Sequence, residues 1–150
     1  MEETRNIAVY CDKNKWESIW FTEHHFNHEG MENCTNPLMM GADIAARTKN
    51  IRIGQAANII TFHNPLRLAE DIATLDHLSN GRLEVGIGRG VYGREAIHMN
   101  VEADLKDQAK NKRLFEESLT IMNKAWTEEF FNHKGEFYTY LLLILFGSMT

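Results

Sequence analysis

The chain has 150 residues, of which 43% are hydrophobic and 25% charged, and its formal net charge is −5 at pH 7. These values are close to globular averages and exclude a chain that is disordered over most of its length. The negative charge argues against nucleic acid as the main partner, because phosphate binding requires a basic surface.

The cysteines and the apolar runs of the sequence bear on the cellular compartment and on membrane association. Cys11 and Cys34 match no zinc-ligand spacing and form no disulfide framework. The longest apolar run, Leu141–Phe146, is far shorter than the roughly 20 residues of a membrane-spanning helix. Because the N-terminus also lacks an apolar signal segment, we expect a cytoplasmic protein with reduced thiols and no membrane association.

The first third of the chain alternates between helical and extended patterns. Residues 4–14 are weakly helical, and Glu17–Phe21 is a strand candidate. Asn36-Pro37 predicts the start of a helix through about Thr48, because asparagine caps helices well and proline is favoured at their first position. The isoleucine-rich segment Ile51–Ile60 is the second strand candidate.

The same helix-start device recurs at Asn64-Pro65, so both prolines of the chain begin helices. The helix that follows buries one face, at positions spaced by three or four residues, and Asn80-Gly81 predicts a left-handed stop. Arg82–Gly88 is the third strand candidate. The residues of the buried face are Leu68, Ile72, Leu75 and Ser79.

After the third strand we expect a glycine-rich loop and then a long helix from about Asp104 to Trp126. Its predicted buried face is Phe115, Leu119, Met122 and Trp126. The remaining segment, FFNHKGEFYTYLLLILFGSMT, indicates a short extended excursion and then an apolar tail, whose run Leu141–Phe146 is prone to aggregation wherever it is exposed.

Alternating strands and helices predict an α/β fold with parallel βαβ units. Two architectures fit, an open doubly wound sheet or part of a (β/α)₈ barrel, and in both of them ligands bind at the carboxyl ends of the strands. Three polar segments occupy such ends and are expected to converge: Glu23-His24-His25, Ala56-Ala57-Asn58 and Gly88-Arg89-Gly90.

The histidines that follow the first strand suggest either a metal site or an acid–base site. Adjacent residues of an extended chain point to opposite sides, so His24 and His25 do not readily share one metal ion. The HExxH spacing is absent as well, which weighs against a hydrolase with its metal on His24, His25 and His28. An acid–base or substrate-binding role for one histidine and a structural role both stay open.

GIGRGVYG at residues 86–93 is glycine-rich, but position 91 is valine, so the dinucleotide fingerprint GxGxxG is not met. A phosphate or flavin site of another kind, with charge from Arg89, and a plain tight turn remain as readings. The third helix carries four charged residues that predict either a solvated face with internal ion pairs or a contact with a partner subunit. They are Arg67, Glu70, Asp71 and Asp76.

Three stretches together resemble one family. They are WFTEHHF at residues 20–26, NPLRLAEDIATLDHLSNGRLEVGIGRG at 64–90 and HKGEFY at 133–138. Over residues 4–138 the chain resembles the bacterial luciferase-like flavin monooxygenases, and within them the alkanal monooxygenase branch. The resemblance implies an α/β fold that is a partial TIM (β/α)₈ barrel, with parallel strands two to four and room for a short fifth strand.

The resemblance also implies a reaction. Reduced FMN and O2 as co-substrate would oxidise an aldehyde or a similar small organic substrate, without a resident metal. Luciferase proper has a reactive cysteine where this chain has Gly88, so a general monooxygenase is expected rather than light emission. The implied catalytic residues are His24 as acid–base with its neighbours Glu23 and His25. The implied cofactor-binding residues are Ala56 and Ala57, at a non-proline cis peptide under the flavin ring, and Arg89 with Gly88 near the phosphate.

Partners and extent follow from the same resemblance. A flavin reductase would supply reduced FMN, and a homo- or heterodimer would form through helices 37–48 and 65–79. We expect a partial barrel domain at 1–138 and an apolar tail at 139–150, with the remaining barrel strands missing. The alternatives are an inactive barrel fragment or dimerisation partner without tight flavin binding, and a deazaflavin-dependent oxidoreductase of the same superfamily.

Overall fold

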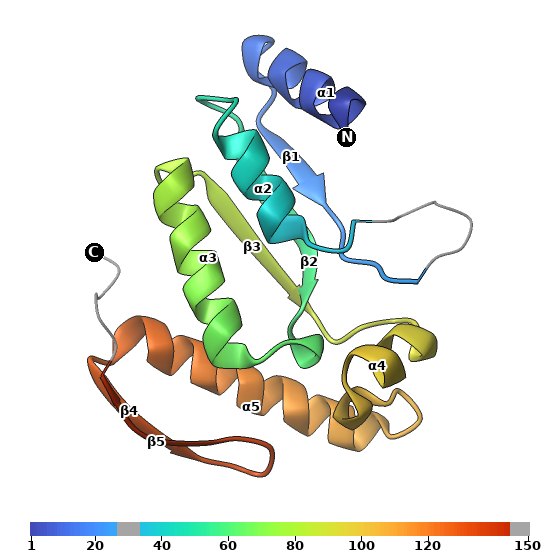
Figure 1. The fold of residues 1–150 in the computed structure, drawn as a ribbon, viewed down its shortest axis with the longest axis vertical. Helices are drawn as coiled ribbons and strands as arrows, with labels where there is room; N and C mark the ends of the chain where they lie inside the picture. The colour runs from blue at the N-terminus through green and yellow to red at the C-terminus, as the bar shows by residue number, and fades with distance from the viewer. Residues whose placement is uncertain (27–33, 145–150) are drawn as a thin grey trace. The chain divides into compact units, whose positions relative to one another are not determined.

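The computed structural model describes residues 1–26 and 34–144 (Figure 1). The chain divides into two compact units, one of Met1–Asn58 with Ile72–Ile87 and one of Ile59–Asp71 with Gly88–Thr150. His28 and the last six residues of the expected tail lie outside the described residues. Among the helices that the structure describes, none has both the length and the apolar character needed to cross a membrane.

A three-stranded parallel sheet forms the centre of the first unit. Its strands are β1 (Ser18–Phe21), β2 (Arg52–Ile59) and β3 (Leu83–Gly88), in the order β1-β2-β3. Ser18 pairs with Arg52 in parallel register, and the Ile53 N–H donates to the Arg82 carbonyl over 2.9 Å. The predicted parallel α/β fold is therefore confirmed, and the carboxyl ends of the three strands share one edge.

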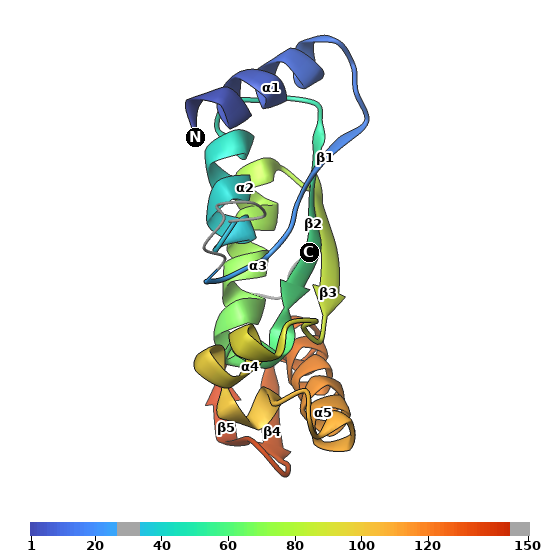
Figure 2. The ribbon, with the colours of Figure 1, turned by 90° about the vertical axis from the view of Figure 1, so that its right-hand side faces the viewer.

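Helices cover one face of this sheet. They are α2 (Pro37–Ala45) and the second half of α3 (Pro65–Ser79), while α1 (Glu2–Lys13) precedes β1 (Figure 2). A side chain at Gly41 of α2 would collide with Leu75 and touch Ile53, so the glycine lets α2 lie close to both α3 and the sheet. The four predicted core positions of α3, from Leu68 to Ser79, are at most 3% exposed.

Both predicted helix starts are confirmed by their caps. The Asn36 side chain accepts the Met39 N–H over 2.8 Å, and the Asn64 side chain accepts the Arg67 N–H over 3.1 Å. Asn80 has a φ of 56°, in the left-handed region that ends α3 as predicted. The second helix, α2, ends three residues earlier than Thr48.

The N-terminal helix is tied to the loop before β2 by one carboxylate. Asp12 accepts the backbone N–H groups of Lys49, Asn50 and Ile51 over 3.1, 2.7 and 2.8 Å. Burial alone would raise the pKa of Asp12, but these three hydrogen bonds and the charge of Arg82 outweigh it and lower the pKa. The charged form of Asp12 therefore stabilises this junction.

The second unit is mainly helical. It contains the short helices η1 (Ile60–Phe62), α4 (Gly93–Met99) and η2 (Val101–Ala103), followed by α5 (Gln108–Thr127). The sequence predicted only a glycine-rich loop where α4 forms, because seven residues give too short a window for a helical period. The buried core of this unit is Ile59, Phe62, Ala96, Ala103 and Leu114.

The predicted buried face of α5 is wrong by about one position. Phe115, Leu119 and Trp126 are only half-buried, and Met122 alone of the predicted four is fully buried. The helix carries two adjacent apolar stripes, and the unit packs on the stripe that the sequence did not favour. That stripe is Asn111, Leu114, Ser118, Ile121 and Met122.

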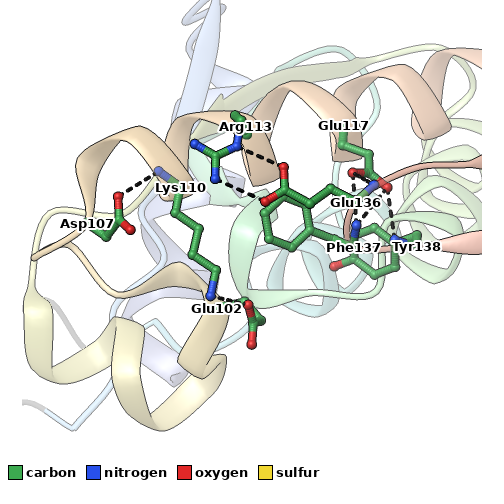
Figure 3. A network of polar contacts seen from close by, with 8 residues as sticks. All are labelled: Glu102, Asp107, Lys110, Arg113, Glu117, Glu136, Phe137 and Tyr138. Carbon is green, nitrogen blue, oxygen red and sulfur yellow. Dashed lines mark hydrogen bonds and ion pairs between the residues drawn. The ribbon is translucent and has the colours of Figure 1, made fainter.

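An antiparallel hairpin of β4 (Phe130–Lys134) and β5 (Thr139–Ile144) follows α5 and forms its own two-stranded sheet. The short extended segment expected from the sequence therefore does not join the parallel sheet. Glu117 of α5 holds the turn, because its carboxylate accepts the backbone N–H groups of Glu136, Phe137 and Tyr138 (Figure 3). The same carboxylate lies 2.9 Å from His133 Nε2.

Burial alone would raise the pKa of Glu117, but the hydrogen bonds from His133 and the three backbone N–H groups lower it overall. A lowered folded-state pKa means that the carboxylate contributes stability above its ordinary pKa of 4.5, and that this contribution is lost as the pH falls through the folded-state value. Acidification should therefore release the hairpin turn from α5.

Replacing Glu117 with glutamine is expected to lower the free energy of unfolding at pH 7 by about 2 kcal/mol, because a neutral amide binds the three N–H groups less strongly. The variant should also lose less stability than the wild type on acidification. Urea unfolding at neutral and acidic pH measures both effects. Glu116→Gln is the control, since Glu116 is exposed and forms an exposed ion pair with Lys112. Equal losses in the two variants would contradict the prediction.

Candidate active site

A buried acid–histidine pair follows β1. Glu23 is 1% exposed and His25 is 7% exposed, and Glu23 Oε1 lies 3.0 Å from His25 Nε2. Burial alternates along this extended segment, because Thr22 and Phe26 are exposed and His24 is half-buried between its two buried neighbours. Alternation is what strand geometry dictates, so Glu23 and His25 point to one side and His24 to the other.

His24 is held by its backbone. Its N–H donates to the Cys34 carbonyl over 3.0 Å, which fixes the chain just beyond β1. Burial raises the pKa of the neighbouring Cys34 thiol, so this cysteine is not poised as a thiolate nucleophile. Of the groups at this strand end, the half-buried imidazole of His24 is the one suited to exchange a proton with a bound molecule.

The described side chains of this strand end also bear on metal binding. Within residues 1–26 and 34–144, no three His, Cys, Asp or Glu side chains are grouped so that they could hold a metal ion. Glu23 and His25 pair with each other, and His28 lies outside the described part of the chain.

A non-proline cis peptide bond joins Ala56 to Ala57 near the end of β2, as the family resemblance implied. Ala56 is exposed. Two residues earlier on the same side, Gly54 lies beneath the indole of Trp20, where no larger side chain would fit. Trp20 is itself 49% exposed. Ala56 and Trp20 are thus both exposed on this face of the sheet, near the segment of Glu23 and His24 that follows β1.

Asn58 ends this stretch with a buried polar group. It is 1% exposed, and its side-chain nitrogen has no hydrogen-bond acceptor among the described residues. A buried donor of this kind is costly unless it binds something, so a polar ligand atom or a bound water fits here.

In the second unit, Gly88 is the last residue of β3 and Arg89 follows it directly. The Arg89 carbonyl accepts hydrogen bonds from Thr61 Oγ1 over 3.2 Å and from Asn111 Nδ2 over 3.4 Å. Gly90 has a φ of 85° and lies against Phe62, so its place requires a glycine. Arg89 is half-buried on this fixed turn. The plain-turn reading and the ligand reading are thus compatible.

Two groups of the first unit suit a flavin ring, and one group of the second unit suits a phosphate. Ala56 offers an exposed, small surface to a planar ring, and Asn58 offers a buried donor without a partner among the described residues. Arg89 offers a cation on a fixed turn for a phosphate group. The first two belong to one unit and Arg89 to the other.

Two groups at these positions were missed by sequence reasoning. Thr61 and Asn111 both bind the backbone of Arg89, yet neither belongs to a motif. Asn111 lay outside the predicted buried face of its helix. The signal available in the sequence was its spacing of three from Leu114, which places a polar residue on an apolar stripe.

The parallel βα arrangement defines the chain as an α/β protein, with two histidines directly after its first strand. The family model of luciferase-like monooxygenases matches residues 1–145, so the chain belongs to this family. An F420-dependent secondary alcohol dehydrogenase also matches, with a TM-score of 0.74 at 20% identity, which shows a common fold.

Three related proteins illustrate the likeness. The alkanal monooxygenase beta chain of Photorhabdus luminescens is 32% identical over 91% of this chain and 40% of that protein. The oxygenase component of flavin-dependent trigonelline monooxygenase from Acinetobacter baylyi is 30% identical over 93% of this chain and 37% of that protein.

The third is a solved structure, the oxygenating constituent of 3,6-diketocamphane monooxygenase from Pseudomonas putida, in complex with FMN. It matches with a TM-score of 0.85 and 29% identity, over 93% of this chain and 37% of that one. The chain thus spans less than half the length of the relatives it matches. Two of these three relatives are flavin proteins, the trigonelline monooxygenase by its name and the diketocamphane monooxygenase by its bound FMN.

Proposed function

We propose that this chain contributes the histidine-bearing part of the active site of an FMN-dependent monooxygenase, which oxidises an aldehyde or a similar small organic substrate with O2. The observation that carries the proposal is the half-buried His24, which follows β1 at the same sheet edge as the exposed Ala56 of β2, in a chain that the luciferase-like family model matches. Bound reduced FMN would supply the activation of dioxygen.

The chain's own residues have separate tasks in this proposal. Ala56 and Ala57 support the flavin ring, and Arg89 with Gly88 meets the phosphate. His24 donates or accepts the proton of the reacting group, because its ring is only half-buried and histidine is the side chain that most often serves as a general acid–base. The buried pair of Glu23 and His25 keeps the strand end that carries His24 in place.

Partners follow from the same proposal. A flavin reductase supplies reduced FMN in the cytoplasm, where Cys11 and Cys34 stay unpaired. A homo- or heterodimer forms through helices 37–48 and 65–79. Exposed Met39 on α2 and Leu78 on α3 suit a buried contact, whereas Arg67 is satisfied within its own helix by Glu70 and Asp71.

Titration of the chain with FMN tests the proposal. We expect saturable quenching of flavin fluorescence, and weaker binding of a deazaflavin under the same conditions. No saturable binding at high micromolar FMN would contradict the proposal and favour the alternative of a dimerisation partner without tight flavin binding. Preferred binding of the deazaflavin would favour the oxidoreductase alternative within the superfamily.

A further inference from the structure

Asn111 of α5 is a fully buried polar residue that holds both ends of Arg89. Its Nδ2 donates to the Ala103 carbonyl over 2.9 Å and to the Arg89 carbonyl over 3.4 Å. Its Oδ1 accepts a hydrogen bond from Arg89 Nη1 over 3.4 Å. One amide group therefore contacts the main chain and the guanidinium of the same arginine.

The main chain of Arg89 is already fixed without the contact to its guanidinium. Thr61 Oγ1 binds the Arg89 carbonyl, and Asn100 Nδ2 binds the Thr61 carbonyl over 2.8 Å, which holds the threonine in turn. Gly90 packs against Phe62 on the other side. Several contacts thus hold the main chain of this turn. The guanidinium of Arg89, by contrast, is directed by Asn111.

Among the described residues, no ion pair neutralises the charge of Arg89. In the described part of the chain, Arg89 takes part in none of the ion pairs, although Lys110 and Arg113 of the same unit pair with Glu102 and Glu136. Asn111 accepts a hydrogen bond from the guanidinium without carrying a negative charge. It therefore directs the cation and leaves it free to bind an anion.

We propose that Asn111 is a positioning residue that aims the guanidinium of Arg89 at a phosphate monoester. The inference rests on the proposed function, in which that monoester is the phosphate of FMN. Asn111 acts through Arg89 and touches no reacting atom.

The test compares FMN with riboflavin, which lacks the phosphate, in the wild type and in Asn111→Asp. A carboxylate at this position would pair with Arg89 and compete with the ligand. We expect the preference for FMN over riboflavin to fall about tenfold or more in the variant, with riboflavin affinity unchanged. Asn123→Asp is the matched control, because it makes the same change on the exposed side of α5 and should keep the preference.

A purely structural role of Asn111 would lower the affinities for FMN and riboflavin alike, and an unchanged preference would overturn the inference. Since Asn111 is buried, its variant can fail to fold, so a second measurement uses the wild type alone. On addition of inorganic phosphate, the NMR signals of Arg89 Nε–H and Asn111 Nδ2–H should shift with one shared midpoint. A shift of neither signal, or of only one, would overturn the inference.

The NMR titration also separates this inference from the proposed function. Absent FMN binding, together with coupled phosphate shifts, would contradict the proposed flavin enzyme and keep the assignment of Asn111. Saturable FMN binding with uncoupled shifts would do the reverse.

Discussion

Replacing Arg82 with methionine is expected to lower the free energy of unfolding by about 3 kcal/mol, because several hydrogen bonds to one charged group are lost together. Arg82 stands at the start of β3 and binds the C-terminal ends of two helices. Its guanidinium donates to the carbonyls of Ser79 at 2.7 Å, Ile51 and Ala45 at 3.0 Å and Thr48 at 3.3 Å, and to Thr48 Oγ1 at 2.9 Å.

The position of these carbonyls explains the size of the effect. The C-terminal end of a helix has carbonyl groups without intrahelical partners and carries a partial negative charge. An arginine side chain donates hydrogen bonds to these carbonyls and also offsets the charge. Without Arg82, the ends of α2 and α3 and the start of β2 would lose a common donor. Methionine keeps much of the aliphatic length of arginine, so the variant removes mainly the polar contacts.

Urea unfolding of Arg82→Met and of a control variant, Arg52→Met, measures this effect. Arg52→Met is the matched control, because Arg52 lies in the same unit and pairs with Glu84, and both side chains are 42% exposed. An exposed pair contributes about 1 kcal/mol or less, so the control should lose far less stability. Comparable losses for Arg52→Met and Arg82→Met would contradict the assignment of Arg82 as the common anchor.

Arg82 also shows where sequence reasoning reached its limit. The strand that it begins was predicted, since Leu83–Gly88 is bounded by a recognisable helix stop at Asn80-Gly81. Its five hydrogen-bond contacts lie 31 to 37 residues away or at the adjoining helix end, and no local pattern announces them. The Arg82 guanidinium donates to the carbonyls of Ala45 and Thr48, and this explains why α2 ends earlier than predicted.

Local signals succeeded wherever a single side chain decides the outcome. The caps Asn36 and Asn64 start helices by accepting a nearby N–H, and that interaction is written within four residues of sequence. The hairpin β4–β5 depends instead on Glu117, which lies about 20 residues before the N–H groups that it binds. Its pairing was therefore not readable from the apolar tail alone.

In the candidate site, too, local features were predicted and long-range contacts were not. Strand alternation correctly separated His24 from His25, and the family resemblance pointed to the cis peptide at Ala56-Ala57. The buried support was not predicted, because asparagine in the middle of a helix usually indicates solvent exposure. Asn111 can be recognised only once Arg89 and Ala103 are placed beside it.

Replacing His24 with alanine is expected to reduce kcat for aldehyde oxidation by about 10²- to 10⁴-fold, the usual contribution of a general acid–base. FMN affinity and the free energy of unfolding should change little, because His24 is half-buried and is held through its backbone N–H. Steady-state turnover, FMN titration and urea unfolding measure the three quantities. His77→Ala is the control, since His77 is exposed on α3.

The adjacent histidine should respond in the opposite way. His25→Ala removes the ring that lies 3.0 Å from the Glu23 carboxylate, whose side chain is fully buried, so a buried charge loses a partner and the protein is destabilised. Any loss of turnover in this variant should follow the loss of folded protein. If His25→Ala instead lowered kcat at full stability while His24→Ala retained turnover, the catalytic proton would belong to the buried pair. Strand geometry turns these two adjacent rings to opposite sides. The pair of variants therefore distinguishes a catalytic role of His24 from a structural role of His25.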